Sequence, residues 1–209
     1  MPLLMRHESP SCLWGIWEVS ETIGQLLALV PRPDECQRET EHFTSPKRRT
    51  EWTATRVLLA TLAGPQARIA HEPSGKPYLA DGSDTISISH TNGYAAVILG
   101  RNAQTVGIDI EQYGERIDRL THMFMNGQEK ALPYQGKATW SHLLHWSAKE
   151  TMFKCMDTPE TDFKAHLHIR TFQPQASGTI RAFEDKTELR RHFDIHYLLH
   201  PRFVLTWTC

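Results

Sequence analysis

The sequence predicts an α+β fold in which antiparallel strands pack with two long helices. Two segments have apolar residues at helical spacing, one that begins at Ser45 and one at 137–157 that contains no internal Gly or Pro. Short apolar runs bounded by turn-forming residues lie around these helices and predict strands. The order strand, helix, hairpin occurs in each half of the chain. This recurrence indicates two halves of similar architecture, although no repeat of individual residues is evident.

The first half contains one well-marked helix. Ser45 is typical of an N-cap residue, Pro46 suits the first helical position and Gly64 is a stop signal. The segment Thr91-Asn92-Gly93 has the chemistry of a hairpin turn. The other elements expected here are a strand at 13–19, a short helix at 21–30, a polar stretch with two prolines, and strands at 78–80, 85–89 and 94–99.

In the second half, acidic residues alternate with Ile108 and Ile110, which predicts a strand at 105–111. A helical region is expected at 128–132, followed by the long helix at 137–157. The remaining sequence reads as strands joined by loops that contain Pro174, Gly178 and Pro201. Their expected ranges are 165–172, 179–184, 192–199 and 203–208.

Length and charge limit the classes of protein to consider. A chain of 209 residues suits one large domain or two closely packed halves. Its formal net charge of −1 argues against bulk nucleic acid or an anionic membrane as the main partner. The N-terminus lacks the apolar stretch of a signal peptide, and no run approaches the roughly 18 apolar residues of a membrane span. We therefore expect a soluble, cytoplasmic protein.

The cysteines do not follow the C-x-x-C spacing that is typical of zinc sites. Neither a zinc site nor a disulfide framework is expected from their positions, and a reducing cytoplasm is the simplest setting. They are Cys12, Cys36, Cys155 and Cys209.

Two acidic residues mark a candidate metal site. In an extended strand alternate side chains share a face, so Asp109 and Glu111 point the same way, about 7 Å apart. Two like charges at this spacing are unfavourable unless a cation lies between them, and hard divalent ions such as Mg²⁺ prefer oxygen ligands. Glu150 is the candidate for a third carboxylate. The alternative is an edge strand whose carboxylates are solvated.

Within the expected long helix, Trp146, Glu150 and Lys154 are spaced four residues apart. Residues at this spacing lie one above the other, so a carboxylate is flanked by an aromatic ring and an ammonium group. In the alternative interpretation, Glu150 and Lys154 form an ordinary helix pair that contributes roughly 0.3 kcal/mol.

Four motifs together resemble the 4′-phosphopantetheinyl transferases, specifically the longer, monomeric, surfactin-synthetase-activating type. They are Ser74-Gly75-Lys76-Pro77, Ser87-Ile88-Ser89-His90-Thr91, the segment VGIDIE from Val106 to Glu111, and the segment WSAKETMFK from Trp146 to Lys154. The resemblance runs from about residue 47 to residue 154, and its specificity lies in the order and spacing of the motifs. Thr151 departs from the pattern, because the family usually has Ala or Ser there.

The resemblance implies two similar α+β halves related by a pseudo-two-fold, each an antiparallel sheet packed with a long helix, with the nucleotide between the halves. Residues 1–104 would supply nucleotide-side contacts, and residues 105–209 the metal and catalytic motifs. The implied reaction transfers 4′-phosphopantetheine from coenzyme A to a serine of an apo acyl or peptidyl carrier protein. The products would be the holo carrier protein and adenosine 3′,5′-bisphosphate, and the enzyme would be a monomer.

Residue roles follow from the same motifs. The three carboxylates of the candidate metal site would hold Mg²⁺ or Mn²⁺. Catalysis would involve Glu150 as general base together with Lys154 and His90, and Glu129 is the second candidate for the base. Contacts to coenzyme A are assigned to Arg49, Arg56, Lys76, Ser89, His90, Lys149 and Lys154.

Several of these residues also have ordinary structural interpretations. The basic residues at the start of the helix at Pro46 would equally suit a solvated helix face, although the planar fork of arginine matches phosphate oxygens. Lys76 lies in a turn that Pro77 fixes and Gly75 keeps open to a ligand, and otherwise it is a surface lysine. His90 would otherwise be a hydrogen-bonded structural residue. The remaining histidines are expected on the solvated surface; they include His142, His145, His166, His168, His192 and His196.

The carrier proteins of this family are small, helical and usually acidic. A candidate docking patch follows Arg116, because methionine-rich surfaces adapt to different partners. The alternative is a buried helix. The patch consists of Arg119, Leu120, Met123, Phe124 and Met125.

Two other classes of function compete with the transferase. One is a non-catalytic coenzyme A or nucleotide-binding regulatory protein with the same fold, against which the complete set of acidic residues argues. The other is a nucleic-acid-binding module built on Lys47 to Arg49. The balanced charge and the lack of a basic stripe with interleaved aromatic residues disfavour it. We expect neither a nucleic-acid nor a membrane partner.

Overall fold

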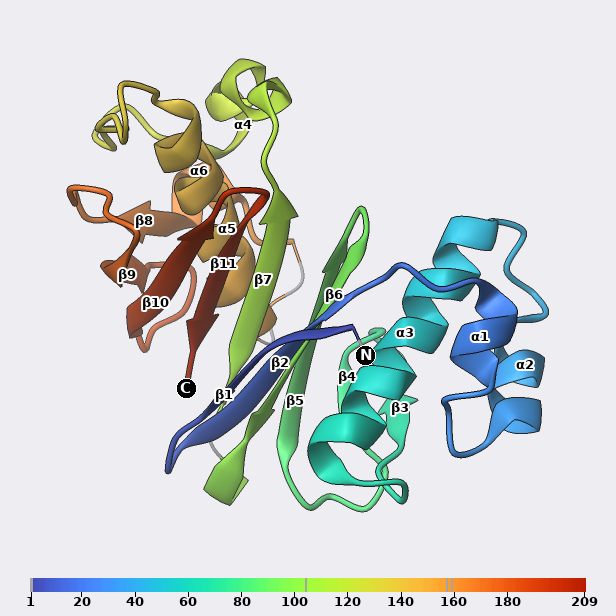
Figure 1. The fold of residues 1–209 in the computed structure, drawn as a ribbon. Helices are drawn as coiled ribbons and strands as arrows, with labels where there is room; N and C mark the ends of the chain where they lie inside the picture. Colours follow the sequence, from blue (N-terminus) through green and yellow to red (C-terminus); the bar gives the residue numbers. More distant parts are fainter. Residues whose placement is uncertain (1, 104, 157, 159) are drawn as a thin grey trace. The chain divides into compact units, whose positions relative to one another are not determined.

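The computed structural model describes residues 2–103, 105–156, 158 and 160–209 (Figure 1). The chain divides into two compact units, one formed by Met1–Val106 together with Cys209 and the other by Gly107–Thr208. Each unit has an antiparallel sheet and a hydrophobic core of its own. The predicted α+β class is confirmed. Among the described residues, no helix combines the length and apolar character needed to cross a membrane.

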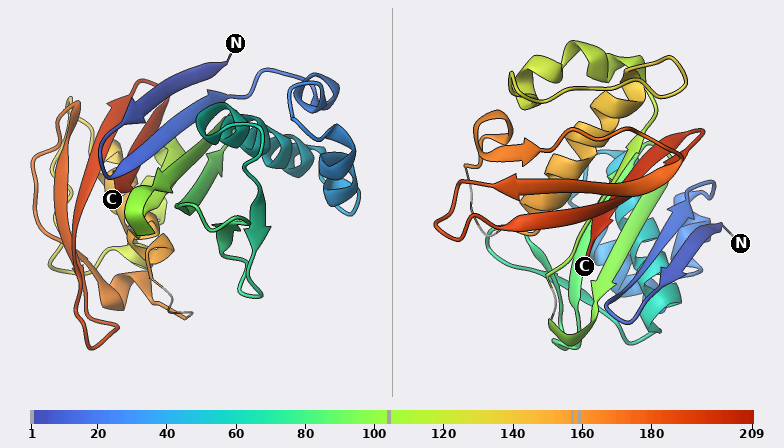
Figure 2. Two further views of the ribbon diagram at one scale, coloured as in Figure 1. Left: turned by 90° about the horizontal axis from the view of Figure 1, so that it is seen from below. Right: turned by 90° about the vertical axis from the view of Figure 1, so that its left-hand side faces the viewer.

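The first unit contains a four-stranded antiparallel sheet with the strand order β1-β2-β6-β5. A separate two-stranded sheet pairs β3 with β4. Helix α3 packs against strands β2 and β6, as the left-hand view of Figure 2 shows. The elements are β1 (Leu3–Glu8), β2 (Cys12–Glu18), α1 (Ile23–Leu27), α2 (Pro33–Thr40), α3 (Pro46–Ala63), β3 (Ile69–His71), β4 (Pro77–Leu79), β5 (Thr85–Thr91) and β6 (Tyr94–Gly100).

Helix α3 forms where the sequence predicts it. The Ser45 side chain accepts a hydrogen bond from the Arg48 N–H, and Pro46 is the first helical residue. Gly64 ends the helix with a φ of +91°, a conformation that glycine adopts without strain. The apolar side of the helix packs into the core of the first unit. Both predicted ends of this helix are confirmed.

Strand β1, helix α2 and strand β3 are absent from the sequence prediction. Helix α2 lies in the polar stretch with two prolines, and of its residues only Cys36 and Thr40 are buried. Such a helix has too little apolar periodicity to be recognised. An ion pair of 2.8 Å between Arg56 Nη2 and Glu39 Oε2 attaches it to α3. Tertiary contacts therefore decide the structure of this segment.

The second unit contains a five-stranded antiparallel sheet with the strand order β7-β11-β10-β9-β8. Figure 1 and the right-hand view of Figure 2 show the long helix α5 against one face of this sheet. The elements are β7 (Gly107–Gln112), a 3₁₀ helix (Glu115–Arg119), α4 (Thr121–Phe124), α5 (Thr139–Lys154), α6 (Phe163–His166), β8 (Leu167–Ile169), β9 (Ser177–Glu184), β10 (His192–His200) and β11 (Phe203–Thr208).

Gly107 explains the close approach of α5 to β7. A Cβ atom at this position would lie 2.7 Å from Cys155 Sγ and would also collide with the carbonyl oxygen of Thr151. Only glycine therefore fits where the C-terminal part of α5 crosses the start of β7. This contact places the polar residues of the strand directly beneath the helix.

Three predictions for the second unit need correction. Residues 128–132 are not helical, and the helical turns of this region lie earlier, in the 3₁₀ helix and α4, ahead of Asn126 and Gly127. The expected strand at 165–172 begins as helix α6, because Asp162 caps a short helix, and only β8 remains extended. Helix α5 ends at Lys154, and its expected end, Asp157, lies outside the described residues.

A disulfide joins Cys12 of β2 to Cys209, within the first unit. This pairing contradicts the expectation of no disulfide. The two residues are 197 positions apart, so their spacing in the sequence carries no sign of the pairing. Cys36 and Cys155 are buried and take no part in this disulfide.

Candidate active site

Strand β7 and helix α5 present polar side chains to each other. At the end of α5, Lys154 Nζ donates to Asp109 Oδ1 at 2.8 Å. Two turns earlier on the helix, Trp146 Nε1 donates to Glu111 Oε1 at 2.7 Å. Glu150 lies one helical turn from each of these donors and therefore on the same side of the helix. The predicted alignment of Trp146, Glu150 and Lys154 is confirmed.

The carboxylates of this cluster influence one another. Burial and, to a smaller extent, the charge of Asp109 raise the pKa of Glu150, which reaches about 7 although Lys154 opposes the shift. Burial, Asp109 and, least, Glu150 likewise raise the pKa of Glu111 to about 7, against the opposing effects of the Trp146 hydrogen bond and of Lys154. Three carboxylates and one ammonium group thus share a partly desolvated space. Negative charge is in excess there.

Among the described residues, no three Asp, Glu, His or Cys side chains lie close enough together to hold a metal ion as they stand. Lys154 donates to Asp109 and Trp146 donates to Glu111, so separate donors hold these two carboxylates. The chemistry of the donor set nevertheless fits a hard divalent cation. It offers oxygen ligands only. Burial, together with the negative charge of Asp109, raises the pKa values of Glu111 and Glu150, and a bound cation would neutralise that negative charge.

A layer of hydroxyl groups joins α5 to β11 next to Asp109. Thr206 of β11 is paired in register with Asp109 of β7. Its Oγ1 atom lies 2.8 Å from Ser147 Oγ and 2.7 Å from Thr151 Oγ1, and these three residues are fully buried. Thr151, which departs from the family pattern, uses its hydroxyl here. This layer is not predicted from the sequence, although two small polar residues four apart on a helix are a recognisable signal.

Lys149 does not lie at the site surface. Its ammonium group is fully buried and donates to Phe124 O at 2.6 Å, Glu129 Oε2 at 2.9 Å and Phe163 O at 3.1 Å. All three of its N–H bonds are therefore used inside the protein. This arrangement corrects the assignment of Lys149 to coenzyme A and gives it a structural role.

The carboxylate of Glu129 is also bound by groups inside the protein. Besides Lys149, its carboxylate accepts the backbone N–H groups of Asn126 at 2.9 Å and Ile169 at 2.8 Å, and its side chain is only 2% exposed. A carboxylate that is held by an ion pair and two backbone donors is poorly suited to collect a proton from a substrate. The structure therefore disfavours Glu129 as the second candidate for the general base.

In the first unit, His90 faces helix α3. His90 Nδ1 lies 3.6 Å from Glu51 Oε2, and Lys47 Nζ lies 3.6 Å from Glu51 Oε1. The His90 side chain is 54% exposed, whereas Ser89, beside it on β5, is buried. Glu51 thus lies between a lysine and an imidazole. Glu51 is not among the residues predicted from the sequence, although its four-residue spacing from Lys47 is a recognisable signal.

The turn that contains Lys76 has the expected geometry. Gly75 has a φ of +89°, in the left-handed region that favours glycine, and its N–H donates to Glu72 O at 2.8 Å. The Lys76 N–H donates to Ser74 Oγ at 3.3 Å. The backbone of the turn is therefore fixed, and the role of the lysine side chain stays a prediction.

The arginines assigned to coenzyme A already have partners in the first unit. Arg49 Nε donates to Phe43 O at 2.8 Å, and its Nη2 donates to Glu41 O at 3.0 Å. Arg56 donates from Nε to Glu39 Oε2 at 2.8 Å. Each guanidinium group fixes the segment that precedes α3. Phosphate binding by either arginine would have to replace these bonds.

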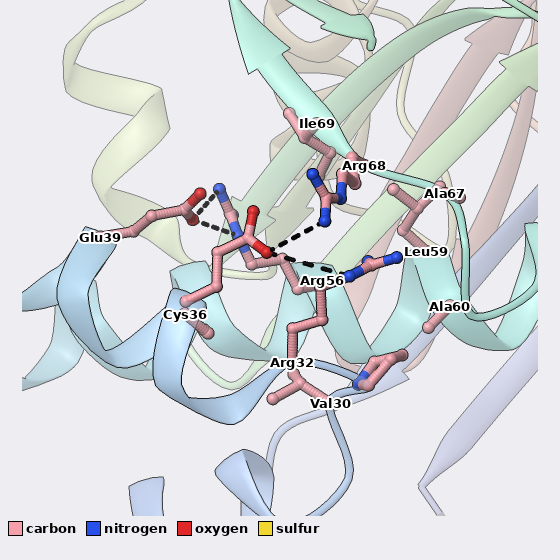
Figure 3. Close-up of a pocket in the computed structure, with 12 residues that line it drawn as sticks. Val30, Arg32, Cys36, Glu39, Arg56, Leu59, Ala60, Ala67, Arg68 and Ile69 are labelled. Atoms are coloured by element: carbon pink, nitrogen blue, oxygen red, sulfur yellow. Dashed lines mark hydrogen bonds and ion pairs between the residues drawn. The ribbon is translucent and has the colours of Figure 1, made fainter. Parts of the chain in front are cut away.

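Figure 3 shows the pocket beside Arg56, between α2, α3 and the segment before β3. Arg68 lies 3.4 Å and Arg32 lies 3.9 Å from Glu35, while Arg56 lies 2.8 Å from Glu39. All three guanidinium groups therefore face carboxylates. The cavity has a volume of about 50 Å³, which suits water and not a nucleotide. It contains none of the predicted metal ligands.

One of the histidines expected at the surface is instead in the core. His145 is fully buried on α5, its Nδ1 lies 2.7 Å from Ser141 O, and its ring packs against Phe172 with 5.4 Å between ring centroids. Burial lowers the pKa of His145 from its ordinary value. His142 is paired with Asp118, with 2.7 Å between Nδ1 and Oδ1.

The candidate docking patch is divided by the structure. Met123 is 62% exposed and Arg119 is also exposed, whereas Phe124 is only 1% exposed and belongs to the hydrophobic core. Leu120 and Met125 pack against that core and are partly buried. Only Met123 and Arg119 are therefore exposed for docking, whereas Phe124 is part of the core.

Comparison with known proteins finds one family model that matches the segment containing this site. Residues 105–208 match the family model of the 4′-phosphopantetheinyl transferase superfamily. The match covers the whole second unit, which contains the acidic cluster, and supports the superfamily. It supports phosphopantetheinyl transfer as the general activity. A comparison with curated proteins found no match.

Proposed function

We propose that this chain is a 4′-phosphopantetheinyl transferase of the longer, monomeric, surfactin-synthetase-activating type. It would transfer 4′-phosphopantetheine from coenzyme A to a serine of an apo acyl or peptidyl carrier protein. The observation that carries the proposal is that Asp109 and Glu111 of β7 face Glu150 and Lys154 of α5, within the segment that matches the superfamily. A sheet packed with a long helix in both units supports two similar halves, and their pseudo-two-fold relation stays a prediction.

The acidic cluster would bind the metal ion. Asp109, Glu111 and Glu150 supply the oxygen ligands that Mg²⁺ or Mn²⁺ requires, and the bound ion would neutralise charge on the diphosphate of coenzyme A. Lys154, which lies 2.8 Å from Asp109, keeps an ammonium group beside the same charge. Trp146 holds one oxygen of Glu111 by its indole N–H.

Glu150 is the proposed general base. Among the described residues, no hydrogen bond to the Glu150 carboxylate is found, whereas Lys154 and Trp146 engage the other two acids. In the proposed step the serine hydroxyl oxygen attacks the β-phosphorus of coenzyme A, and Glu150 accepts its proton directly or through a water molecule. The bond from this phosphorus to the bridging oxygen breaks, and adenosine 3′,5′-bisphosphate leaves with that oxygen.

The first unit would contribute nucleotide contacts through Lys76, Ser89 and His90. Support comes from the fixed turn at Lys76 and from the exposure of His90 at the end of β5. Arg49 and Arg56 remain in the proposal only as residues that exchange their present carbonyl and carboxylate partners for phosphate. Lys149 is no longer included, because its ammonium group is buried.

Mass spectrometry of a carrier protein tests the proposal directly. The protein is incubated with an apo carrier domain, coenzyme A and Mg²⁺, and a carrier adduct of one phosphopantetheine group is expected. A chelator should abolish the adduct, and excess Mg²⁺ should restore it. Coenzyme A binding without any adduct, over a panel of fatty-acid, polyketide and peptide carriers, would favour the non-catalytic binding protein instead.

A further inference from the structure

Trp146 is held between two aromatic side chains of the second unit. The Phe124 ring meets it edge-on, with 5.4 Å between ring centroids, and the Phe163 ring lies 5.5 Å away at a tilt. Both arrangements are favourable for aromatic pairs. The two phenylalanines come from different elements, the end of α4 and the start of α6. The indole ring is therefore fixed by parts of the chain that are distant in sequence.

Lys149 anchors both of these phenylalanines. Its buried ammonium group donates to the backbone carbonyl of Phe124 at 2.6 Å and to that of Phe163 at 3.1 Å. Glu129 balances its charge at 2.9 Å. One lysine on α5 thus holds, through main-chain bonds, the two residues whose rings flank a tryptophan three positions earlier on the same helix. Charge-assisted hydrogen bonds in a buried setting resist displacement.

The fixed indole ring is aimed at Glu111. Its N–H donates to Glu111 Oε1 at 2.7 Å, a short distance for a nitrogen donor. A carboxylate on a strand can rotate about its side-chain bonds, and a rigid donor at one oxygen selects one orientation. Donors behind a metal ligand commonly set its orientation and affect metal affinity about 10-fold to 100-fold when they are removed.

We propose that Trp146 is a positioning residue, whose indole N–H orients Glu111 for metal binding, and that Lys149 keeps Trp146 in place through Phe124 and Phe163. The inference rests on the proposed function, because it assumes that Glu111 is a ligand. It adds a role for the tryptophan and for the buried lysine, neither of which touches coenzyme A or the metal ion in this scheme.

Binding of Mn²⁺, followed by electron paramagnetic resonance, tests the inference without reference to turnover. We expect Trp146→Phe to weaken Mn²⁺ binding about 10-fold. Trp140→Phe is the matched control on the same helix, because Trp140 packs beside Tyr113 at 4.3 Å and has no part in the cluster. Its Mn²⁺ affinity should stay within about twofold of wild type, since its indole N–H does not orient a proposed ligand.

A double-mutant cycle separates orientation from general damage. In a Glu111→Gln background the oriented carboxylate is gone, so Trp146→Phe should cause no further loss of Mn²⁺ affinity. Additive losses, or a Trp146→Phe protein that binds Mn²⁺ like wild type, would overturn the inference. Near-ultraviolet circular dichroism of each variant reports whether the aromatic packing is intact.

A second variant is needed in case phenylalanine at position 146 disturbs the fold. Incorporation of 3-benzothienylalanine at this position keeps the size and shape of the ring and replaces the N–H by sulfur. This protein should fold normally and show the same loss of Mn²⁺ affinity, and wild-type affinity would contradict the inference. If the wild-type protein itself binds no Mn²⁺, the proposed metal site fails, and the inference fails with it.

Discussion

At the scale of single residues, Asp109 is the centre of the acidic cluster. It is 4% exposed, its charge raises the pKa of both Glu111 and Glu150, and Lys154 is its counter-ion. The alternation of acids with Ile108 and Ile110 in a strand is readable from sequence. The partners that surround these acids come from a helix some forty positions later, and only the folded chain brings them together.

Replacement of Asp109 by Ala should reduce pantetheinyl transfer by about 100-fold or more, because a central metal ligand is lost. The measurement is the initial rate of carrier modification in Mg²⁺, together with a urea unfolding curve. Asp194→Ala is the matched control, since Asp194 is exposed on β10 and is not part of the cluster. An Asp109→Ala protein with normal turnover would refute the metal assignment.

Met123 tests the carrier surface. Its exposed side chain should contact an apolar part of the carrier, so Met123→Asp should raise the KM for the carrier about fivefold to tenfold and leave the KM for coenzyme A unchanged. Leu189→Asp is the control, because Leu189 is also apolar and is 78% exposed, in the loop between β9 and β10. Equal effects of the two variants would show that Met123 is not a specific contact.

At the scale of elements, helix α5 is held on opposite sides by different chemistry. Trp146 and Lys154 bind the acids of β7, Ser147 and Thr151 bind the hydroxyl of Thr206, and the interior side carries a buried ion pair. This explains why a helix without an N-cap hydrogen bond has a fixed position. The sequence pattern identifies the helix, and the partners on each side fix its rotation.

Replacement of Lys149 by Met should lower the free energy of unfolding by roughly 3–5 kcal/mol, because the Glu129 carboxylate would remain buried without its counter-ion. The double variant Lys149→Met with Glu129→Met should recover much of this loss. Lys137→Met is the control: Lys137 is paired with exposed Glu115, and its loss should change stability far less than the loss of Lys149. Urea unfolding of the four proteins is the measurement, and equal stabilities of the Lys149 variant and wild type would contradict the prediction.

His145 should make stability depend on pH. Burial lowers its pKa in the folded protein, so below about pH 6.5 the unfolded chain takes up a proton that the folded chain does not. The free energy of unfolding should therefore fall as the pH is lowered below that value. This residue can contribute at most about 1.4 kcal/mol per pH unit to the fall. The measurement is the difference in the free energy of unfolding in urea between wild type and His145→Gln, taken at pH 7.5 and at pH 5.5. A pH-independent difference would contradict the assignment.

At the scale of the whole molecule, the disulfide between Cys12 and Cys209 closes a loop that contains nearly the entire chain. Without reductant, the denatured protein should accept two thiol labels, at Cys36 and Cys155, and after reduction it should accept four. A loop of this length restricts the unfolded chain strongly, and reduction should lower the free energy of unfolding by roughly 3–5 kcal/mol. Four labels before reduction would show that the bond does not form.

Sequence periodicity was sufficient for elements whose stability is local. Helix α3 has its cap, its first-position proline and its terminal glycine in the sequence, and β6 and β11 are apolar runs between turns. Periodicity was insufficient for α2, whose residues are mostly polar. It was also insufficient for 128–132, which are not helical and where Glu129 accepts a hydrogen bond from the buried Lys149. The candidate site follows the same rule: residue types were predicted, while the burial of Lys149 and Glu129 was not.

The sequence by itself determined which acids, cations and caps this protein possesses, because alternation along a strand and four-residue spacing along a helix are properties of neighbouring residues. The tertiary structure alone decided that Trp146 donates a hydrogen bond to Glu111 and that Lys149 is buried in an ion pair. It also decided that His145 is in the core and that Cys12 pairs with Cys209. Burial and long-range contact depend on how the elements pack, and two side chains with the same local pattern can face either solvent or the core.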